Sequence, residues 1–167
     1  MSASLTRVLI VTLLMSVTVT GQTTTPERKR LDAMAGTWRI EVDLKATPLS
    51  APTKATGTEQ CQWFADRHVV CRAEAKGPAG SYSQMRTLSY IPAQKQYALY
   101  TIDSLGTALI AYGQVSGDTW TFTTTQSPLN IRVTLKMAAA SYTALAEFAG
   151  PDGKYLPLSE VKGTRTK

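Results

Sequence analysis

Residues that could carry acid–base or nucleophilic chemistry are few in this chain, and none falls in a recognised motif. His68 is the only histidine among 167 residues, and a serine-hydrolase triad needs such a base beside a serine and an orienting carboxylate. The sequence has no G-x-S-x-G elbow, no H-E-x-x-H pair and no glycine-rich phosphate loop. We therefore expect no catalytic residue. If the protein is an enzyme, Asp103, Ser104 and His68 are the groups that would serve it.

The two cysteines, Cys61 and Cys71, flank an expected turn at residues 64–67. In an exported chain, such a pair predicts a structural disulfide across a hairpin. Two cysteines and one distant histidine are too few ligands for a zinc site. His68 could be an axial haem ligand only if it faced the interior of the fold. We expect neither a metal nor a cofactor.

Four isolated carboxylates alternate with apolar residues along the expected strands: Glu41, Asp43, Glu59 and Glu74. Alternation of this kind is typical of a sheet with one dry face and one solvated face. We interpret all four as members of the solvated face, and not as an acid–base pair.

The N-terminus has the layout of a secretory signal peptide. A short start with one positive charge, at Arg7, is followed by an uncharged and mostly apolar run at residues 8–19. That run is shorter than the roughly 20 residues of a transmembrane helix, which favours a cleaved signal peptide over a stable membrane anchor. We predict a signal peptide at 1–21, a flexible lead with a short helix at 22–36, and one domain at 37–167. The protein is then secreted or periplasmic.

The net charge of +6 at pH 7 comes from 18 lysines and arginines against 12 aspartates and glutamates. These basic residues are dispersed, with one small cluster at 28–30 beside acidic neighbours. A nucleic-acid site would need a basic stripe with aromatic stacking positions. We expect no nucleic-acid partner.

Alternating apolar and polar residues predict strands along most of the chain. From Trp38 to Lys45 the alternation is uninterrupted, as in a strand with one buried face. Before it, Thr25 as N-cap, Pro26 at the first helical position and Gly36 as a stop predict one short helix. Further strands are expected at about 55–63, 68–75, 81–90, 96–102, 107–113, 119–125, 130–137, 141–149 and from 155 onward.

Short connections between these strands favour an antiparallel meander. A meander of this many strands exposes two edges unless it closes on itself, and closure removes both. We predict an all-β fold: an up-and-down β-barrel of about 8–10 strands with one short N-terminal helix.

Several sequence pieces carry a resemblance to a known group of proteins. They are AGTW (35–38), TGTEQCQW (56–63), YIPAQKQY (90–97), IDSLGT (102–107) and GPDGK (150–154). A short helix leading into Gly-Thr-Trp resembles the entrance of calycin barrels. The full set is similar to a family of exported, lipocalin-like bacterial proteins classed as a domain of unknown function. The resemblance implies a calycin-like barrel that binds a small apolar molecule. Such proteins often have a glycine pair after the tryptophan of the second piece, where this chain has Ala65-Asp66.

Bulky residues on separate strands are the candidates for lining a ligand site. For each aromatic residue the alternative is simple core filling, and a tryptophan that opens the first strand more often plugs the closed barrel end. Asp103 either orients a polar head group at the rim or only forms the turn with Ser104. The candidate ligand-binding residues are Trp38, Trp63, Tyr82, Met85, Tyr100, Asp103, Tyr112 and Phe122.

Our leading hypothesis is an extracytoplasmic barrel that binds a small hydrophobic or amphipathic molecule. The alternatives are an enzyme built on the same barrel, and a non-catalytic interaction module of the cell envelope whose interior is packed solid. The sequence makes no prediction about the oligomeric state.

Overall fold

The computed structural model describes residues 25–47, 51–124 and 130–166. The predicted signal peptide at 1–21 lies outside the described residues, as do residues 22–24 of the predicted lead, so these domain boundaries stay a prediction. Within the described residues, no helix combines the length and apolar character needed to cross a membrane.

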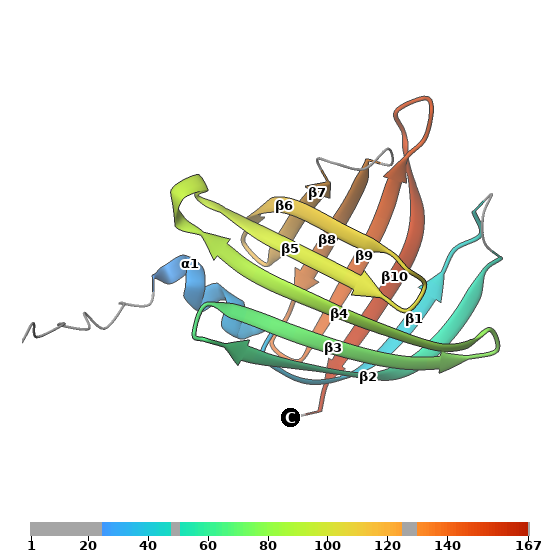
Figure 1. The fold of residues 1–167 in the computed structure, drawn as a ribbon, viewed down its shortest axis with the longest axis horizontal. Coiled ribbons are helices and arrows are strands. Elements are labelled where there is room, and N and C mark those ends of the chain that lie inside the picture. Colours follow the sequence, from blue (N-terminus) through green and yellow to red (C-terminus); the bar gives the residue numbers. More distant parts are fainter. Residues whose placement is uncertain (1–24, 48–50, 125–129, 167) are drawn as a thin grey trace, which may run out of the picture.

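Ten antiparallel strands form one closed barrel (Figure 1). Each strand pairs with the next one in sequence, and the last strand closes the barrel by pairing with the first, Val42 lying opposite Val161. The predicted up-and-down barrel is confirmed. Its strands are β1 Gly36–Leu44, β2 Thr53–Phe64, β3 His68–Gly77, β4 Gly80–Ile91, β5 Gln96–Asp103, β6 Ala108–Ser116, β7 Thr119–Thr124, β8 Ile131–Met137, β9 Ser141–Ala149 and β10 Tyr155–Arg165.

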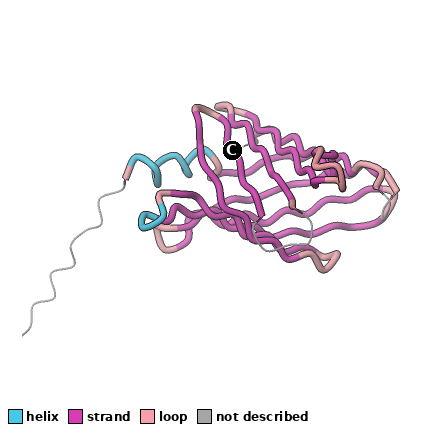
Figure 2. The backbone as a smooth tube through the Cα atoms, turned by 90° about the horizontal axis from the view of Figure 1, so that it is seen from above, coloured by secondary structure: helices cyan, strands magenta, loops and turns pink. Residues whose placement is uncertain are grey.

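A short helical segment lies at one end of the barrel, where the chain enters the first strand (Figures 1 and 2). It begins as α1, Pro26–Lys29, capped by the Thr25 hydroxyl, and continues as a 3₁₀ turn, η1, Arg30–Ala33. The sequence predicted a single short helix here, and its second half is the tighter 3₁₀ form. Leu31 and Met34 are completely buried, so this segment covers the barrel end with apolar side chains. A second 3₁₀ turn, η2 Pro92–Gln94, joins β4 to β5.

The alternation in β1 translates directly into burial. Trp38, Ile40 and Val42 point into the barrel, while Arg39 and Glu41 are exposed. Side chains alternate between the two faces of a strand, so each of the remaining strands also points every second side chain into the barrel.

The hairpin between β2 and β3 carries the disulfide. Cys61 and Cys71 are direct cross-strand partners with Cα atoms 4.0 Å apart, and their sulfur atoms are bonded. The disulfide predicted from the sequence is therefore present. Ala65 and Asp66 in the turn have φ angles of 49° and 51°, the left-handed region that favours glycine. A glycine pair at this position would adopt the same turn with less strain.

Candidate functional site

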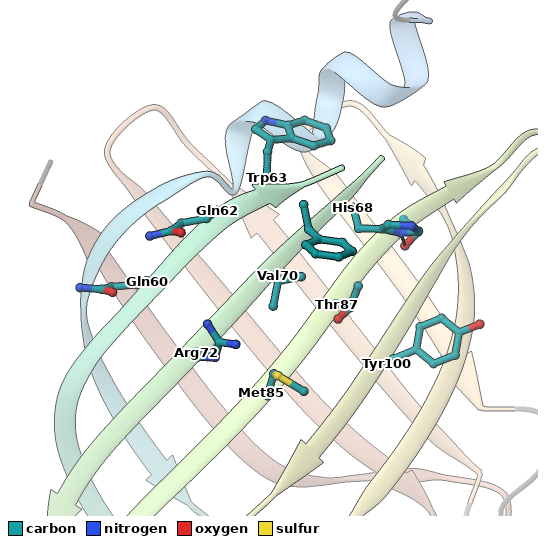
Figure 3. A pocket seen from close by; sticks show the side chains of 11 residues that line it. Gln60, Gln62, Trp63, His68, Val70, Arg72, Met85, Thr87 and Tyr100 are labelled. Carbon is teal, nitrogen blue, oxygen red and sulfur yellow. Dashed lines mark hydrogen bonds between the residues drawn. The ribbon is translucent and has the colours of Figure 1, made fainter. Parts of the chain in front are cut away.

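An open groove of about 600 Å³ lies on the outer face of β2, β3, β4 and β5. Figure 3 shows polar and apolar side chains that project from neighbouring strands on this side. We call it the outer groove. Its lining residues are Gln60, Gln62, Trp63, Phe64, His68, Val70, Arg72, Met85, Thr87, Ser89 and Tyr100.

Part of the outer groove is lined by exposed aromatic and apolar side chains, whereas the solvated face of a strand usually carries polar ones. Phe64 is 65% exposed, and Met85 and Tyr100 are also exposed. Tyr112 lies on the adjacent strand, where a side-chain hydrogen bond between the two phenols raises the pKa of Tyr100. Exposed apolar groups that gather in one place often mark a contact surface.

His68 belongs to this outer face. Its Nδ1 atom is 2.6 Å from the Ser89 hydroxyl, and among the described residues no carboxylate is hydrogen-bonded to it. Asp103 and Ser104 lie near the opposite end of β4, where Ser104 accepts a hydrogen bond from the Ser83 amide. Ser89 lies six residue steps after Ser83 along β4, about 20 Å away at roughly 3.3 Å per step. The three groups considered for catalysis therefore do not form one site. His68 also does not face inward, as an axial haem ligand would have to.

A second hollow, of about 160 Å³, lies inside the barrel. We call it the cavity. Its apolar wall comes from β1, β2, β3 and β10, and its mouth lies beside the β3–β4 turn, near residues 77–81. The apolar side chains that line it are Ile40, Val42, Leu44, Ala55, Ala73, Ala79, Leu105 and Val161.

Small inward residues leave this space open. Ala55 on β2 and Ala73 on β3 line it from inward positions, where larger side chains would fill the barrel. The other side of the barrel is solid, because Trp120, Phe122 and Leu135 are completely or almost completely buried there.

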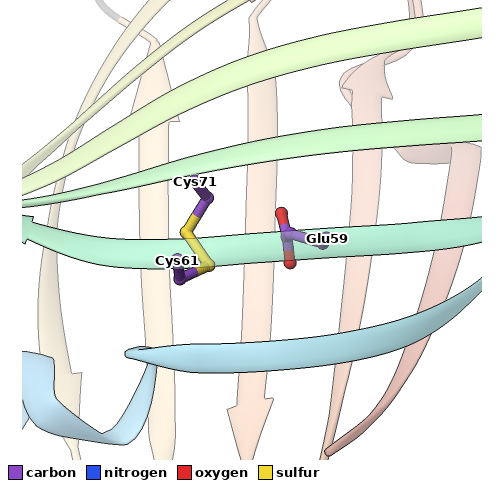
Figure 4. A group of neighbouring side chains, drawn as sticks. All are labelled: Glu59, Cys61 and Cys71. Atoms are coloured by element: carbon purple, nitrogen blue, oxygen red, sulfur yellow. A yellow bond between two sulfur atoms is a disulfide. The ribbon is translucent and has the colours of Figure 1, made fainter. Parts of the chain in front are cut away.

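A buried polar triad, Glu59, Arg86 and Tyr142, forms the inner end of the cavity. Arg86 Nη2 donates to Glu59 Oε2 at 2.6 Å and to the Tyr142 hydroxyl oxygen at 3.3 Å. The Tyr142 hydroxyl donates to the same Glu59 oxygen at 2.7 Å. Figure 4 shows Glu59 beside the Cys61–Cys71 disulfide on the wall of the barrel. The sequence-based assignment of Glu59 to the solvated face is wrong: it is only 2% exposed.

The surroundings of Arg86 and Tyr142 raise the pKa values of both side chains. Burial alone would lower the pKa of Arg86, but the charge of Glu59 and the hydrogen bonds that Arg86 donates to Glu59 and Tyr142 raise it above its ordinary value. Burial raises the pKa of the Tyr142 hydroxyl, and Glu59 adds to the rise while Arg86 opposes it. The guanidinium is therefore charged, and the phenol is a neutral donor at every physiological pH.

Gly163 on β10 makes room for the tyrosine of the triad. A Cβ atom at Gly163 would lie 2.1 Å from Cε1 of Tyr142. The ring packs edge-on against Trp38, with the ring centroids 5.1 Å apart. The indole thus holds the triad from the side of the closed barrel end.

Trp38 belongs to this closed end. Its Nε1 donates to the Met34 carbonyl at 3.0 Å, and the Arg165 guanidinium lies 4.1 Å from its ring centroid. Arg165 also donates to the carbonyl oxygens of Ala33 and Ala35. The helical segment, the first strand and the last strand are therefore joined around one buried indole.

Tyr82 stands at the mouth of the cavity. Its hydroxyl lies 3.4 Å from Asp103 Oδ2 and accepts a hydrogen bond from Gln84 Nε2 at 2.7 Å. Burial and the Asp103 carboxylate raise the pKa of Tyr82. Asp103 Oδ1 accepts from the amides of Leu105 and Thr107, so the carboxylate both forms the turn and touches the rim.

The structure divides the predicted ligand-binding residues among three places. Tyr82 lines the cavity, and Asp103 is bonded to it. Trp38 and Phe122 are completely buried in the core. The remaining four lie at the outer groove or next to it: Trp63, Met85, Tyr100 and Tyr112.

The sequence reasoning missed the triad, although the sequence holds a signal for it. Glu59 has the same strand parity as Cys61, and cysteine is among the residue types most often buried. Arg86 likewise shares parity with Leu88. A charged residue at an inward position is rarely left unpaired, so two such residues of opposite sign would have pointed to each other.

The described residues contain one cluster with the elements of a metal site. One carboxylate oxygen of Glu59 and the sulfur atoms of Cys61 and Cys71 lie within 4.8 Å of one another. Because the sulfurs are joined in a disulfide, they offer no thiolate, which is the form that binds metals. This cluster does not fit a metal ion.

The closed antiparallel barrel with a short helical segment at one end is a lipocalin-like, calycin-type fold. Residues 23–155 match the family described as "Protein of unknown function (DUF1579)", and this chain belongs to that family. No curated protein matches it in sequence.

Solved structures share the fold. Rv2717c from M. tuberculosis has a TM-score of 0.66 at 11% identity, covering 86% of this chain and 99% of the other. The S-type phycobiliprotein lyase CPES from Guillardia theta has a TM-score of 0.58 at 11% identity, with 84% and 93% covered. Together with the family match, this likeness of fold confirms the predicted lipocalin-like family of unknown function.

Proposed function

We propose that this protein is an extracytoplasmic, lipocalin-like binder of a small hydrophobic or amphipathic molecule, held in the cavity. The observation that supports this most is the combination of largely apolar walls with a buried polar triad. The other polar residues of the lining are Thr53, Lys54, Ser81, Tyr82, Gln84 and Ser159. Ligand sites typically have this composition, because apolar burial supplies affinity and a few polar groups fix orientation.

The size of the cavity limits the ligand. Most drug-sized sites have about 300–1,000 Å³, whereas an apolar cavity of about 150 Å³ takes up benzene. A hollow of about 160 Å³ therefore suits a molecule with a single ring or a short alkyl chain. Haem and long acyl chains are too large for it in this conformation.

Two features support a location outside the cytoplasm. The Cys61–Cys71 disulfide is the kind of bond that persists in an oxidising compartment. The apolar run at residues 8–19 after Arg7 has the pattern of a signal peptide. Cell fractionation with N-terminal sequencing of the mature protein tests this location. We expect a new N-terminus close to residue 22, and an unprocessed cytoplasmic chain would contradict it.

Ligand-detected NMR with toluene tests binding in the cavity. We expect saturation transfer to toluene with the native protein and its loss with Ala73→Leu, because Ala73 lines the cavity and leucine would fill it. Glu74→Leu is the matched control, since Glu74 is the next residue on β3 and points outward. Equal binding by native protein and Ala73→Leu would contradict the proposal, as would no binding at all.

A second candidate function is that of a protein-interaction module of the cell envelope, supported by the exposed Phe64, Met85 and Tyr100 in the outer groove. A photo-crosslinking amino acid at Gln62 would test it in cells. We expect a crosslinked species that disappears with Phe64→Asp and persists with Asp66→Asn, an exposed position in the neighbouring turn. Recovery of only the uncrosslinked chain would rule this candidate out.

A further inference from the structure

The Arg86 guanidinium has hydrogen-bonding capacity that the protein does not use. Of its five N–H groups, the two hydrogen bonds to Glu59 and Tyr142 both start from Nη2. Nε is buried without a partner among the described residues, and no hydrogen bond from Nη1 is found among them either. Arg86 is 9% exposed and lines the cavity. Nε is too deeply buried for a ligand to reach, whereas Nη1 is not among the fully buried unsatisfied atoms. The N–H groups of Nη1 are therefore the donors that Arg86 offers to an acceptor in the cavity.

The charge balance of the cavity restricts what that acceptor can be. Glu59 already neutralises Arg86 at 2.6 Å. Among the described residues that line the cavity, Lys54 is the only other charged one, and its side chain is exposed at the mouth. A ligand carboxylate beside the triad would place a second negative charge next to one positive charge. Burying an uncompensated charge is strongly unfavourable, whereas a neutral oxygen accepts the same N–H groups without that penalty.

We propose that the ligand has a neutral oxygen acceptor, such as an amide or alcohol, held by Arg86, and that the site disfavours carboxylates. Its short apolar part lies against Ile40, Val42 and Val161, which line the cavity. Tyr142 and Glu59 orient the guanidinium through the hydrogen bonds described above. This inference rests on the proposed function, because it names the chemical class bound in the same cavity.

Two probes with one carbon skeleton test the inference: hexanamide, which is neutral, and hexanoate, which is ionised at pH 7. We expect isothermal titration calorimetry on the native protein to give at least tenfold tighter binding for hexanamide. In Glu59→Gln the charge of Arg86 is no longer neutralised, so we expect hexanoate to gain at least tenfold and the preference to reverse. Glu147→Gln is the matched control, because it makes the same change in the Arg132–Glu147 ion pair, which does not line the cavity, and it should keep the native preference.

The outcomes separate this inference from the proposed function. If toluene and hexanamide bind but hexanoate binds equally or more tightly to the native protein, only the preference for a neutral head group is overturned. The same holds if Glu59→Gln folds, as circular dichroism would show, and leaves the preference unchanged. If Glu59→Gln does not fold, the ratio of the two probes on the native protein decides alone. If neither toluene nor either probe binds, the proposed function itself fails.

Discussion

The two sides of the barrel interior are built on different principles. Strands β5 to β8 form a filled wall, whose inward side chains Leu99, Trp120, Phe122 and Leu135 are almost completely buried. Strands β1, β2, β3 and β10 form a hollow wall around the cavity, to which β2 and β3 contribute the small inward residues Ala55 and Ala73. Packing stabilises the filled wall, since large buried side chains contribute the most burial energy.

The hollow wall has to be held by other interactions. Glycine and alanine bury little apolar surface, but this side of the barrel has the disulfide between β2 and β3 and the Glu59–Arg86 ion pair. Both connect neighbouring or nearby strands without filling the space between them. The difference between the two walls indicates that the interior cavity is kept open where covalent and polar links replace part of the packing. Each of these links can be broken separately.

The largest effect is expected from breaking the ion pair on one side only. Arg86→Met leaves the Glu59 charge buried and unpaired, which should lower the free energy of unfolding by about 3–5 kcal/mol. The double variant Glu59→Leu with Arg86→Met should recover most of that loss. Urea denaturation measures both values. Arg132→Met, which breaks the more exposed pair with Glu147, serves as control and should cost about 1 kcal/mol or less.

Loss of the disulfide should weaken the hollow wall by a smaller amount. Replacing Cys61 and Cys71 with alanine removes a bridge between residues ten apart and should lower the free energy of unfolding by about 2–3 kcal/mol. A reducing agent should shift the unfolding midpoint of the native protein to that of the variant. A midpoint that is unaffected by reduction would show that the bridge does not hold this wall.

A pair of matched alanine substitutions compares the walls directly. Ala111→Leu adds volume to the filled wall, where Ala111 is completely buried, and overpacking there should cost about 1–3 kcal/mol. Ala73→Leu adds the same volume next to the cavity and should change stability by less than about 1 kcal/mol, because the space is empty. Thermal unfolding monitored by calorimetry distinguishes them. Equal destabilisation at both positions would mean that the cavity is not open in solution.

The smallest effect concerns the turn that joins the two disulfide-linked strands. Ala65 has a φ of 49°, and a left-handed conformation costs a residue with a Cβ roughly 1–2 kcal/mol. Ala65→Gly should therefore raise the unfolding free energy by about 0.5–1 kcal/mol after the greater chain entropy of glycine is included. Arg67→Gly, just outside the left-handed pair, should instead lower it in the same denaturation assay.

Much of the fold was predictable because it follows from local patterns. The alternation that begins at Trp38 has a period of two, which indicates a strand with one buried face. Turn residues mark where strands end, and the pairing of Cys61 with Cys71 follows from their positions on either side of a hairpin. These signals are short in range, so one sequence is enough to read them.

The candidate site was less predictable because it joins residues that are far apart in sequence. The triad joins three strands: Glu59 comes from β2, Arg86 from β4 and Tyr142 from β9. No short sequence pattern predicts the contact between Arg86 and Tyr142 or the cavity that they line. Met85 and Tyr100 were chosen for their size, but their side chains point outward, since a shift of one residue in register moves a side chain to the opposite face.

Composition and periodicity alone specify a closed antiparallel barrel with a helix at one end and a disulfide across one hairpin. Only the tertiary structure places the small residues Ala55 and Ala73 beside the cavity, the large residues Trp120 and Phe122 on the opposite side, and an ion pair between Glu59 and Arg86 in the cavity lining. The physical reason is that alternation defines which side of a strand is dry, whereas the volume left inside depends on how the inward side chains of all ten strands add up around the barrel.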